Sequence, residues 1–421
     1  MIAETPGLLD AVRSRFAHVE ACPFEGPRVF FENAGGALHL KSVVETSAAY
    51  ASYPDNEGRD NAASRAMTAA VQQGRADMRI FLNAPDGEVM VGESGTEILF
   101  RLIRTAALNA PEGGIMLGST LEHPASTSAM ARWAAVTGRR HVRVAHDDAT
   151  GALDVAAYAA AVTPETRVAS IIHTSPVTGM ATDVAGVAAA IRAVAPDCFI
   201  VVDGIQHASH GSVDVASYGV DGYAVSPYKM FSRHGYGVGW ASPRLSAADR
   251  EALIGSREGN WELGTRDAGS YATFSDVVDY LVWLGDEARG EAGGEATRRQ
   301  RLEAGARAIG AQERALTDAM LHGTGNLAGL AEIPGVTLVG GPGVERREGV
   351  FSLALQQVAA ADLVARLREQ GIRVHIRKND HYSGNVLGPL GLEACIRVSI
   401  AHYNTEAEVA RFLAAMAEIA A

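Results

Sequence analysis

The chain has 421 residues, of which 47% are hydrophobic and 20% are charged, an ordinary balance for a globular protein. Because this length exceeds what one hydrophobic core usually fills, we expect two domains. The net charge of −12 argues against nucleic acid or an anionic membrane as partner, since both are bound by a basic surface. A small molecule is therefore the expected ligand.

Residues 1–6 lack the basic region and following apolar stretch of a secretion signal, and no apolar run approaches the roughly 18 residues of a membrane span. These features predict a cytoplasmic protein. The three cysteines are widely spaced and form neither a disulfide framework nor a zinc pattern. We expect them to be reduced thiols: Cys22, Cys198 and Cys395.

Short β-rich runs alternate with alanine-rich helical segments in the first two thirds of the chain. This alternation is typical of an α/β fold with a mostly parallel sheet. Helices are expected at 98–108 and 184–194. Strands are expected at 114–118, 141–145, 168–173, 198–203, 222–226 and 238–242.

The pattern changes near residues 290–310, where a glycine-rich charged segment leads into a long charged helical stretch at 296–319. The residues beyond it predict a smaller α+β domain, joined by an N-terminal helix at 8–16. We expect a large domain at 29–290 and a small domain formed by 1–28 and 291–421. In the small domain, strands are expected at 336–339, 350–355, 374–377 and 396–400, and helices at 360–370 and 406–417.

Two segments carry the strongest functional signal. Asp203-Gly204-Ile205-Gln206 ends an apolar run, and Ser226-Pro227-Tyr228-Lys229 places a lysine 26 positions after the aspartate. A lysine amine can hold the aldehyde of pyridoxal 5'-phosphate as a Schiff base, and a buried carboxylate can keep the pyridine nitrogen protonated. The layout therefore predicts a pyridoxal-phosphate site with Lys229 as the attachment point.

A phosphate site is expected at the start of the helix predicted at 98–108. Ser94 and Glu97 have the spacing of a capping box, which marks a helix N-terminus. The amides of such an end favour phosphate, Gly95 allows close approach of the backbone, and Thr96 offers a hydroxyl. Most such boxes are only caps, so the phosphate interpretation depends on the Lys229 segment.

Other candidate residues leave alternatives open. His123 follows a predicted strand and either stacks on a cofactor ring or is an ordinary loop histidine. His207 and His210 have no acidic or cysteine partner at metal-ligand spacing, so no metal site is expected. Arg397 interrupts an apolar strand and either binds a substrate carboxylate or pairs with an internal acid. The glycines at 235–239 precede a strand and do not predict a dinucleotide site.

These motifs, in this order, resemble the cysteine desulfurase-like branch of the class V aminotransferases. The resemblance spans nearly the whole chain and implies the fold of the fold type I pyridoxal-phosphate enzymes. Its large domain would be built on a mostly parallel seven-stranded sheet, with a smaller α+β domain beside it. The motifs are residues 31–36, 94–97, 122–123, 203–206, 226–229, 261–265 and 397–405.

The resemblance also implies residue roles. Lys229 would carry the cofactor and act as base, Asp203 would pair with the pyridine nitrogen, and Gln206 would bond the ring hydroxyl. His123 would stack on the ring as the third catalytic residue. The phosphate would be held by Thr96 and Ser226, with Gly95 and Tyr228 as further cofactor-binding residues.

Substrate and subunit contacts follow from the same resemblance. Arg397 would bind the α-carboxylate of an amino acid, with Asn33 and Ala34 as further substrate-binding residues. Thr265 is similar to a family threonine that reaches a phosphate in the neighbouring subunit. A homodimer with shared sites is therefore expected, with no nucleic-acid or membrane partner.

The chain departs from the family pattern in the loop 377–385, where cysteine desulfurases carry the cysteine that accepts sulfur as a persulfide. No cysteine is present there. Pro176 and Tyr228 are smaller departures, at positions where relatives often have asparagine and histidine. We therefore expect β-elimination from a cysteine conjugate, giving a thiol, ammonia and a 2-oxo acid. Transamination, epimerisation and decarboxylation remain alternatives, and a non-catalytic binding protein is disfavoured because Lys229, Asp203 and His123 are retained.

Basic residues alternate with apolar ones at 373–377. On a strand this places Val374 and Ile376 on the core face and the basic side chains on the other. The basic face either meets an anionic substrate tail or forms a solvated edge, since charged strand faces are often simply exposed. Both interpretations stay open.

Overall fold

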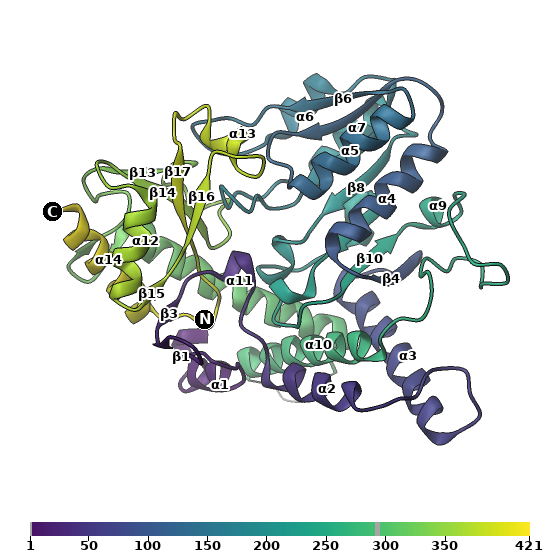
Figure 1. The fold of residues 1–421 in the computed structure, drawn as a ribbon, viewed down its shortest axis with the longest axis horizontal. Helices are drawn as coiled ribbons and strands as arrows, with labels where there is room; N and C mark the ends of the chain where they lie inside the picture. The colour runs from purple at the N-terminus through teal and green to yellow at the C-terminus, as the bar shows by residue number, and fades with distance from the viewer. Residues whose placement is uncertain (1, 291–294) are drawn as a thin grey trace.

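A seven-stranded sheet forms the centre of the first part of the chain in this computed structural model, which describes residues 2–290 and 295–421 (Figure 1). The strand order is β4-β10-β9-β8-β7-β5-β6. Five neighbouring strands pair in parallel, while β10 runs antiparallel to both β9 and β4. The strands are β4 (Glu88–Gly92), β5 (Ile115–Ser119), β6 (Arg140–Val144), β7 (Thr166–Ile172), β8 (Phe199–Asp203), β9 (Gly222–Val225) and β10 (Gly237–Ala241).

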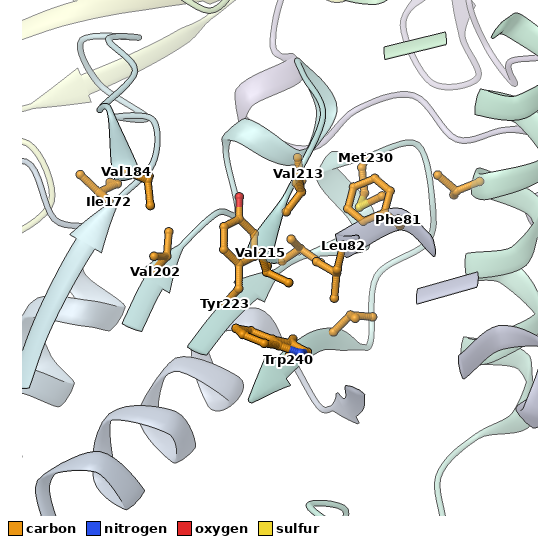
Figure 2. Packing of buried hydrophobic residues seen from close by; sticks show 14 of the residues in the cluster. Phe81, Leu82, Ile172, Val184, Val202, Val213, Val215, Tyr223, Met230 and Trp240 are labelled. Atoms are coloured by element: carbon orange, nitrogen blue, oxygen red, sulfur yellow. The ribbon is translucent and has the colours of Figure 1, made fainter. Parts of the chain in front are cut away.

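The predicted α/β fold with a mostly parallel seven-stranded sheet is confirmed. Six of the strands were expected within a residue or two, and the seventh, β4, joins through antiparallel pairing with β10. Every residue of β8 is buried, as is typical of a parallel strand covered on both faces. Figure 2 shows part of this core, where Tyr223 and Trp240 of the sheet lie near Leu82.

Helices flank this sheet. The long α10 (Ala268–Arg289) packs against α2 (Lys41–Ala51), α3 (Ala62–Leu82) and α11 (Arg298–His322), whereas α4 (Gly95–Asn109) packs against several strands and α5 (Pro124–Val136). The remaining α-helices of this part are α1 (Leu8–Ser14), α6 (Val155–Ala161), α7 (Val184–Val194), α8 (Val215–Tyr218) and α9 (Pro243–Ser246).

A second, four-stranded antiparallel sheet has the order β13-β14-β17-β16. A separate hydrophobic cluster joins it to α12 and α14. Beside it β15 (Ile372–Arg373) pairs in parallel with β3 (Val29–Phe30), which ties the start of the chain to this region. The other elements are β13 (Val336–Leu338), β14 (Val350–Leu355), β16 (His375–Lys378), β17 (Ala394–Ser399), α12 (Ala360–Glu369), α13 (Gly384–Leu387) and α14 (Glu406–Ala420).

The structure corrects the predicted elements in two places. The sequence-based prediction left α3 and α10 unassigned, although both are longer than most of the helices it identified. The predicted N-terminal helix ends at Ser14, and Phe16 instead forms an isolated bridge with Leu40. The predicted domain boundary adjoins residues 291–294, which lie outside the described residues, so the domain division stays a prediction. Within the described residues, no helix is long and apolar enough to cross a membrane.

Candidate active site

The candidate site lies where β8 and β9 end and α4 begins. Asp203 is the last residue of β8, Ser226 follows β9, and Lys229 ends the short 3-10 turn Pro227–Lys229. Open α/β sheets bind ligands at the carboxyl ends of their strands, which explains this placement. A small cavity here is lined by Thr96, His123, Ile172, Thr174, Pro176, Asp203, Ile205, Gln206, Ser226, Tyr228 and Lys229.

Lys229 is buried, and its Nζ donates to Oε1 of Gln206 at 3.3 Å. Burial and the positive charges of Arg397 and Arg377 lower the pKa of Lys229 to about 7, against the opposing effect of Asp203. A large share of the amine is therefore neutral near pH 7 and able to act as a nucleophile or base.

Asp203 is held by hydrogen bonds and forms no ion pair within residues 2–290 and 295–421. Its Oδ1 accepts from the amide of Ile205 at 3.1 Å, and its Oδ2 accepts from the Ser126 hydroxyl at 3.4 Å. Burial raises the pKa of Asp203, while the Ile205 amide and Lys229 oppose the rise. A buried carboxylate fixed in this way is suited to receive a positively charged ring nitrogen.

His123 caps the N-terminus of α5, since its Nδ1 accepts from the amide of Ala125 at 3.0 Å. The proton of the neutral ring therefore belongs on Nε2. Burial and the charges of Lys229, Arg377 and Arg397 lower the pKa of His123 to about 3. The ring is thus neutral at physiological pH and can lie against an aromatic cofactor without burying a charge.

The start of α4 forms a tight cradle beside Ser226. Ser94 caps the helix by accepting from the amide of Glu97 at 3.1 Å. A Cβ atom at Gly95 would lie 2.3 Å from Oγ of Ser226, and one at Gly237 would lie 2.3 Å from the carbonyl carbon of Ser94. Glycine at both positions allows the helix N-terminus to approach Ser226 after β9 and the start of β10 closely. Such an end, with hydroxyls beside it, fits a phosphate group.

Arg397 is 1% exposed and lies on β17, facing this site. One Nη1 donor bonds the carbonyl oxygen of Pro176 at 3.1 Å, whereas its buried Nε has no partner. In the described part of the chain, no carboxylate forms an ion pair with it. The internal salt bridge that the sequence left open is therefore absent there, and the guanidinium has donors left for a ligand.

The groups around the cavity fit pyridoxal 5'-phosphate: an amine with a lowered pKa, a buried carboxylate, a neutral imidazole and a helix N-terminus. The sequence model of the aminotransferase class-V family matches residues 29–265 and 295–412. The chain belongs to the aminotransferase class-V family. Its members use pyridoxal 5'-phosphate, so this chain is a pyridoxal-phosphate-dependent enzyme.

Known relatives of this class V chain agree in sequence and fold. It is 27% identical over 412 residues to a probable cysteine desulfurase of Xylella fastidiosa (strain 9a5c), covering 93% of this chain and 91% of the relative. A solved cysteine desulfurase from Thermococcus onnurineus NA1 superposes with a TM-score of 0.79 at 21% identity, covering 93% of this chain and 94% of the other. One from Escherichia coli gives 0.77 at 23% identity, covering 97% and 98%.

Five predicted site residues of this class V enzyme lie outside the cavity lining: Gly95, Arg397, Asn33, Ala34 and Thr265. Asn33 is engaged internally, donating from Nδ2 to the carbonyl oxygen of Ser399 at 2.8 Å, and the amide of Ala34 donates to the Ser399 hydroxyl at 2.8 Å. Thr265 is exposed in a separate surface depression that also contains Asn56. Substrate contacts from Asn33 and Ala34 and a phosphate contact from Thr265 stay predictions.

The two histidines of residues 207–210 have carboxylate partners that local spacing did not reveal. Nδ1 of His207 lies 2.8 Å from Glu348, and Nδ1 of His210 lies 2.7 Å from Glu313. Nε2 of His210 lies 3.2 Å from Nε2 of Gln206, so this pair supports the residue that bonds Lys229. Both carboxylates are more than 100 positions away in sequence, so the lack of an acid at metal-ligand spacing gave no information about these two contacts.

Sequence reasoning also missed Tyr382, from the loop after β16. Its ring meets the ring of His123 edge-on at 5.0 Å, and the guanidinium of Arg377 lies 3.9 Å from its centre. The sequence had drawn attention to the loop 377–385 for its missing cysteine and to Arg377 for its charge, but not to Tyr382. No sequence pattern predicts that Tyr382 reaches the site, because it lies in an irregular turn whose conformation has no simple sequence signature.

Glu122 is a further buried group beside the site. Its carboxyl accepts from Ser119 at 3.1 Å, from Ser170 at 3.0 Å and from the amide of Ile172 at 2.9 Å. Burial and the charge of Asp203 raise the pKa of Glu122 to about 7. It precedes His123 directly and fixes the loop that carries it.

An aromatic cluster lies behind the lysine segment. Phe231, two positions after Lys229, has a positive φ of 72°, a conformation that is strained for a residue with a side chain. Its ring packs edge-on against Phe16 at 5.5 Å and His402 at 5.0 Å, and against Tyr280 at 6.0 Å. Packing from three distant parts of the chain therefore holds this backbone in place.

Proposed function

We propose that this class V enzyme is a C–S β-lyase that cleaves a cysteine conjugate. The observation that supports it is the residue that the loop 377–385 presents to His123, which is Tyr382 and not a cysteine. A persulfide acceptor must be an accessible thiolate. Cys198 and Cys395 are buried, and burial raises the pKa of Cys198 to about 12 and of Cys395 to about 11. Cys22 lies on the short strand β1 (Ala21–Cys22), outside the cavity lining.

The protein groups fit the steps of an elimination. Pyridoxal phosphate, when bound, supplies the electron sink for a carbanion at Cα. Arg397 would bind the carboxylate and so fix the position of Cα. Lys229, with a pKa of about 7, would remove the Cα proton. His123 would stack on the face of the cofactor ring, and Asp203 would stabilise the protonated ring nitrogen.

The overall reaction balances without a protein thiol. Proton removal at Cα is followed by loss of the β-sulfur as a thiolate, which takes up a proton. Water then replaces the amino group. An S-substituted cysteine plus water gives a thiol, ammonium and pyruvate, and no oxidant or reductant is consumed.

We also infer a homodimer with shared sites. Thr265 is exposed and lies outside the Lys229 cavity, in a depression that it shares with Arg75 and Glu57. In that position, Thr265 would contact a cofactor phosphate in a second copy of the chain. Sedimentation of the purified protein, with Thr265→Ala compared for cofactor affinity, tests this arrangement: a monomer with full cofactor affinity would contradict it.

The elimination is tested with cofactor-loaded protein and S-substituted cysteines, by measuring products by mass. We expect thiol, ammonium and pyruvate in equal amounts. A variant with Cys22, Cys198 and Cys395 all replaced by Ala should keep this turnover within about twofold, since cavity formation at a buried thiol costs on the order of 1 kcal/mol of folding free energy and touches no reacting group.

Two results would contradict the proposal. An oxo acid formed without ammonium would indicate transamination. A persulfide formed by the unchanged protein, and lost together with turnover in the cysteine-free variant, would indicate desulfurase chemistry.

A further inference from the structure

We propose that the substrate is an amino acid whose side chain carries a second acidic group, a carboxylate or a sulfinate, and that Arg377 binds this group while Arg397 binds the α-carboxylate. This inference rests on the proposed function, since it takes the Lys229 cavity to be an amino-acid site. For a cysteine conjugate, the acid would belong to the group attached to sulfur.

The two arginines lie on one face of the four-stranded sheet. In the antiparallel pair β16–β17, Arg377 is opposite Cys395 and His375 is opposite Arg397. Because side chains alternate along a strand, Arg377 and Arg397 project from the same face as diagonal neighbours, with Cβ atoms roughly 7 Å apart. Two guanidinium groups so placed can each take one acid of the same small molecule.

The face of the sheet that carries Arg377 and Arg397 lies toward the Lys229 cavity. The charge of Arg377 is one cause of the lowered pKa of Lys229 and of His123. Arg377 also lowers the pKa of Arg397, which burial brings to about 10. Among the two alternatives that the sequence left open for the basic strand, this geometry favours contact with an anionic ligand over a solvated edge.

Neither arginine forms an ion pair with a carboxylate in residues 2–290 and 295–421, although the charge of Glu32 acts to raise the pKa of Arg397 and that of Arg377 helps to lower the pKa of Asp380. The nearest candidates are engaged elsewhere: Glu32 bonds Arg373 at 2.7 Å and contacts His375 at 3.2 Å. Asp380 accepts from the backbone amides of Tyr382 at 2.9 Å and Ser383 at 3.3 Å. Nε of Arg377 and Nε of Arg397 are both buried without a hydrogen-bond partner. Unpaired buried donors of this kind are costly, and an anionic ligand would satisfy them.

Tyr382 lies between these cations and His123. Its ring is 3.9 Å from the Arg377 guanidinium, and its hydroxyl is near enough to Arg397 to raise that residue's pKa. The phenol can donate a third hydrogen bond to a bound acid. The loop that lacks a cysteine thus offers an anion-binding group in the region where a substrate side chain would extend.

The test is a titration of the cofactor-loaded protein with L-aspartate, L-cysteine sulfinate and L-alanine, following the absorbance of the bound pyridoxal phosphate. We expect both acidic amino acids to bind at least about tenfold more tightly than alanine, since a charge-assisted hydrogen bond adds this much or more. Aspartate and sulfinate together distinguish which acid the site prefers.

Three variants locate the effect. Arg377→Gln should lower the ratio of acidic to neutral affinity by about tenfold, whereas Arg377→Lys should keep part of the preference because it keeps the charge. The neighbouring Lys378→Gln is the matched control, because Lys378 is exposed and alternates to the other face of β16. It should leave the ratio unchanged.

The outcomes separate this inference from the proposed function. Equal affinity for the three amino acids, or an equal loss for all of them in Arg377→Gln, overturns the second acid site and leaves an amino-acid enzyme. If no amino acid changes the absorbance of the bound cofactor, both the proposed amino-acid site and this inference are contradicted.

Discussion

The two sheets place different kinds of groups in and around the candidate site. The seven-stranded sheet supplies Asp203, Ser226 and Lys229 from the ends of neighbouring strands, and these groups match the cofactor. The four-stranded sheet supplies Arg377 and Arg397 from the face of a β-strand pair. We propose that the first set determines which reaction is possible, and that the second determines which molecule is bound. Substitutions in the first region should therefore lower turnover for every substrate, whereas substitutions in the second should change which amino acids bind.

The largest effect is expected for Lys229→Ala. Without the amine, the site loses both its attachment point and its base, so turnover should fall at least about 1000-fold for every substrate. Borohydride reduction followed by peptide mass analysis should label Lys229 in the unchanged protein, which should be yellow, and leave the variant unlabelled. Label on a different lysine, or a protein that stays colourless with excess cofactor, would break the assignment of the whole region.

Asp203→Asn should cost less. The amide is similar in shape but cannot hold a charged ring nitrogen, so the cofactor should stay bound while kcat falls by about 100-fold. Cofactor content by absorbance and kcat by product formation are measured on the same sample. The loss should be alike for acidic and neutral amino acids, in contrast to Arg377→Gln. Full activity of Asp203→Asn would remove ring protonation from this residue's role.

The smallest effect concerns pH and links the two regions. The pKa of Lys229 is lowered to about 7, so its reactive neutral form predominates above that pH instead of only above the ordinary lysine value. The rate at which apoprotein takes up pyridoxal phosphate should therefore rise with pH and level off above about 7. Arg377→Gln removes one positive charge and should move this midpoint upward, whereas Lys378→Gln should not. An unchanged midpoint in Arg377→Gln would show that the second region does not tune the first.

The residues of the candidate cofactor region have local signals in the sequence. They lie at the ends of uniformly apolar strands such as β8, or at a helix start marked by Ser94, and both patterns are local. The structure brings Thr96, His123, Asp203, Gln206, Ser226, Tyr228 and Lys229 to one cavity.

The region that we propose binds the substrate could be predicted only in part. Alternation at 373–377 indicated a basic face, but not whether that face met solvent or the site. This depends on how the four-stranded sheet sits against the Lys229 cavity, which no local pattern encodes. The same holds for Glu348 and Glu313, whose histidine partners are 141 and 103 positions away. The long helix α10 was missed because its apolar residues face several neighbours and its periodicity is weak.

The aromatic cluster around Phe231 makes the candidate site depend on the N-terminal segment. Phe16 belongs to the N-terminal segment, yet it packs on Phe231, the strained residue two positions after Lys229. Deleting about the first sixteen residues would remove Phe16, one of the side chains that pack against Phe231 and keep it in its left-handed conformation. The backbone that positions Lys229 would then be less constrained. We therefore expect truncation of the N-terminal segment to impair the candidate active site.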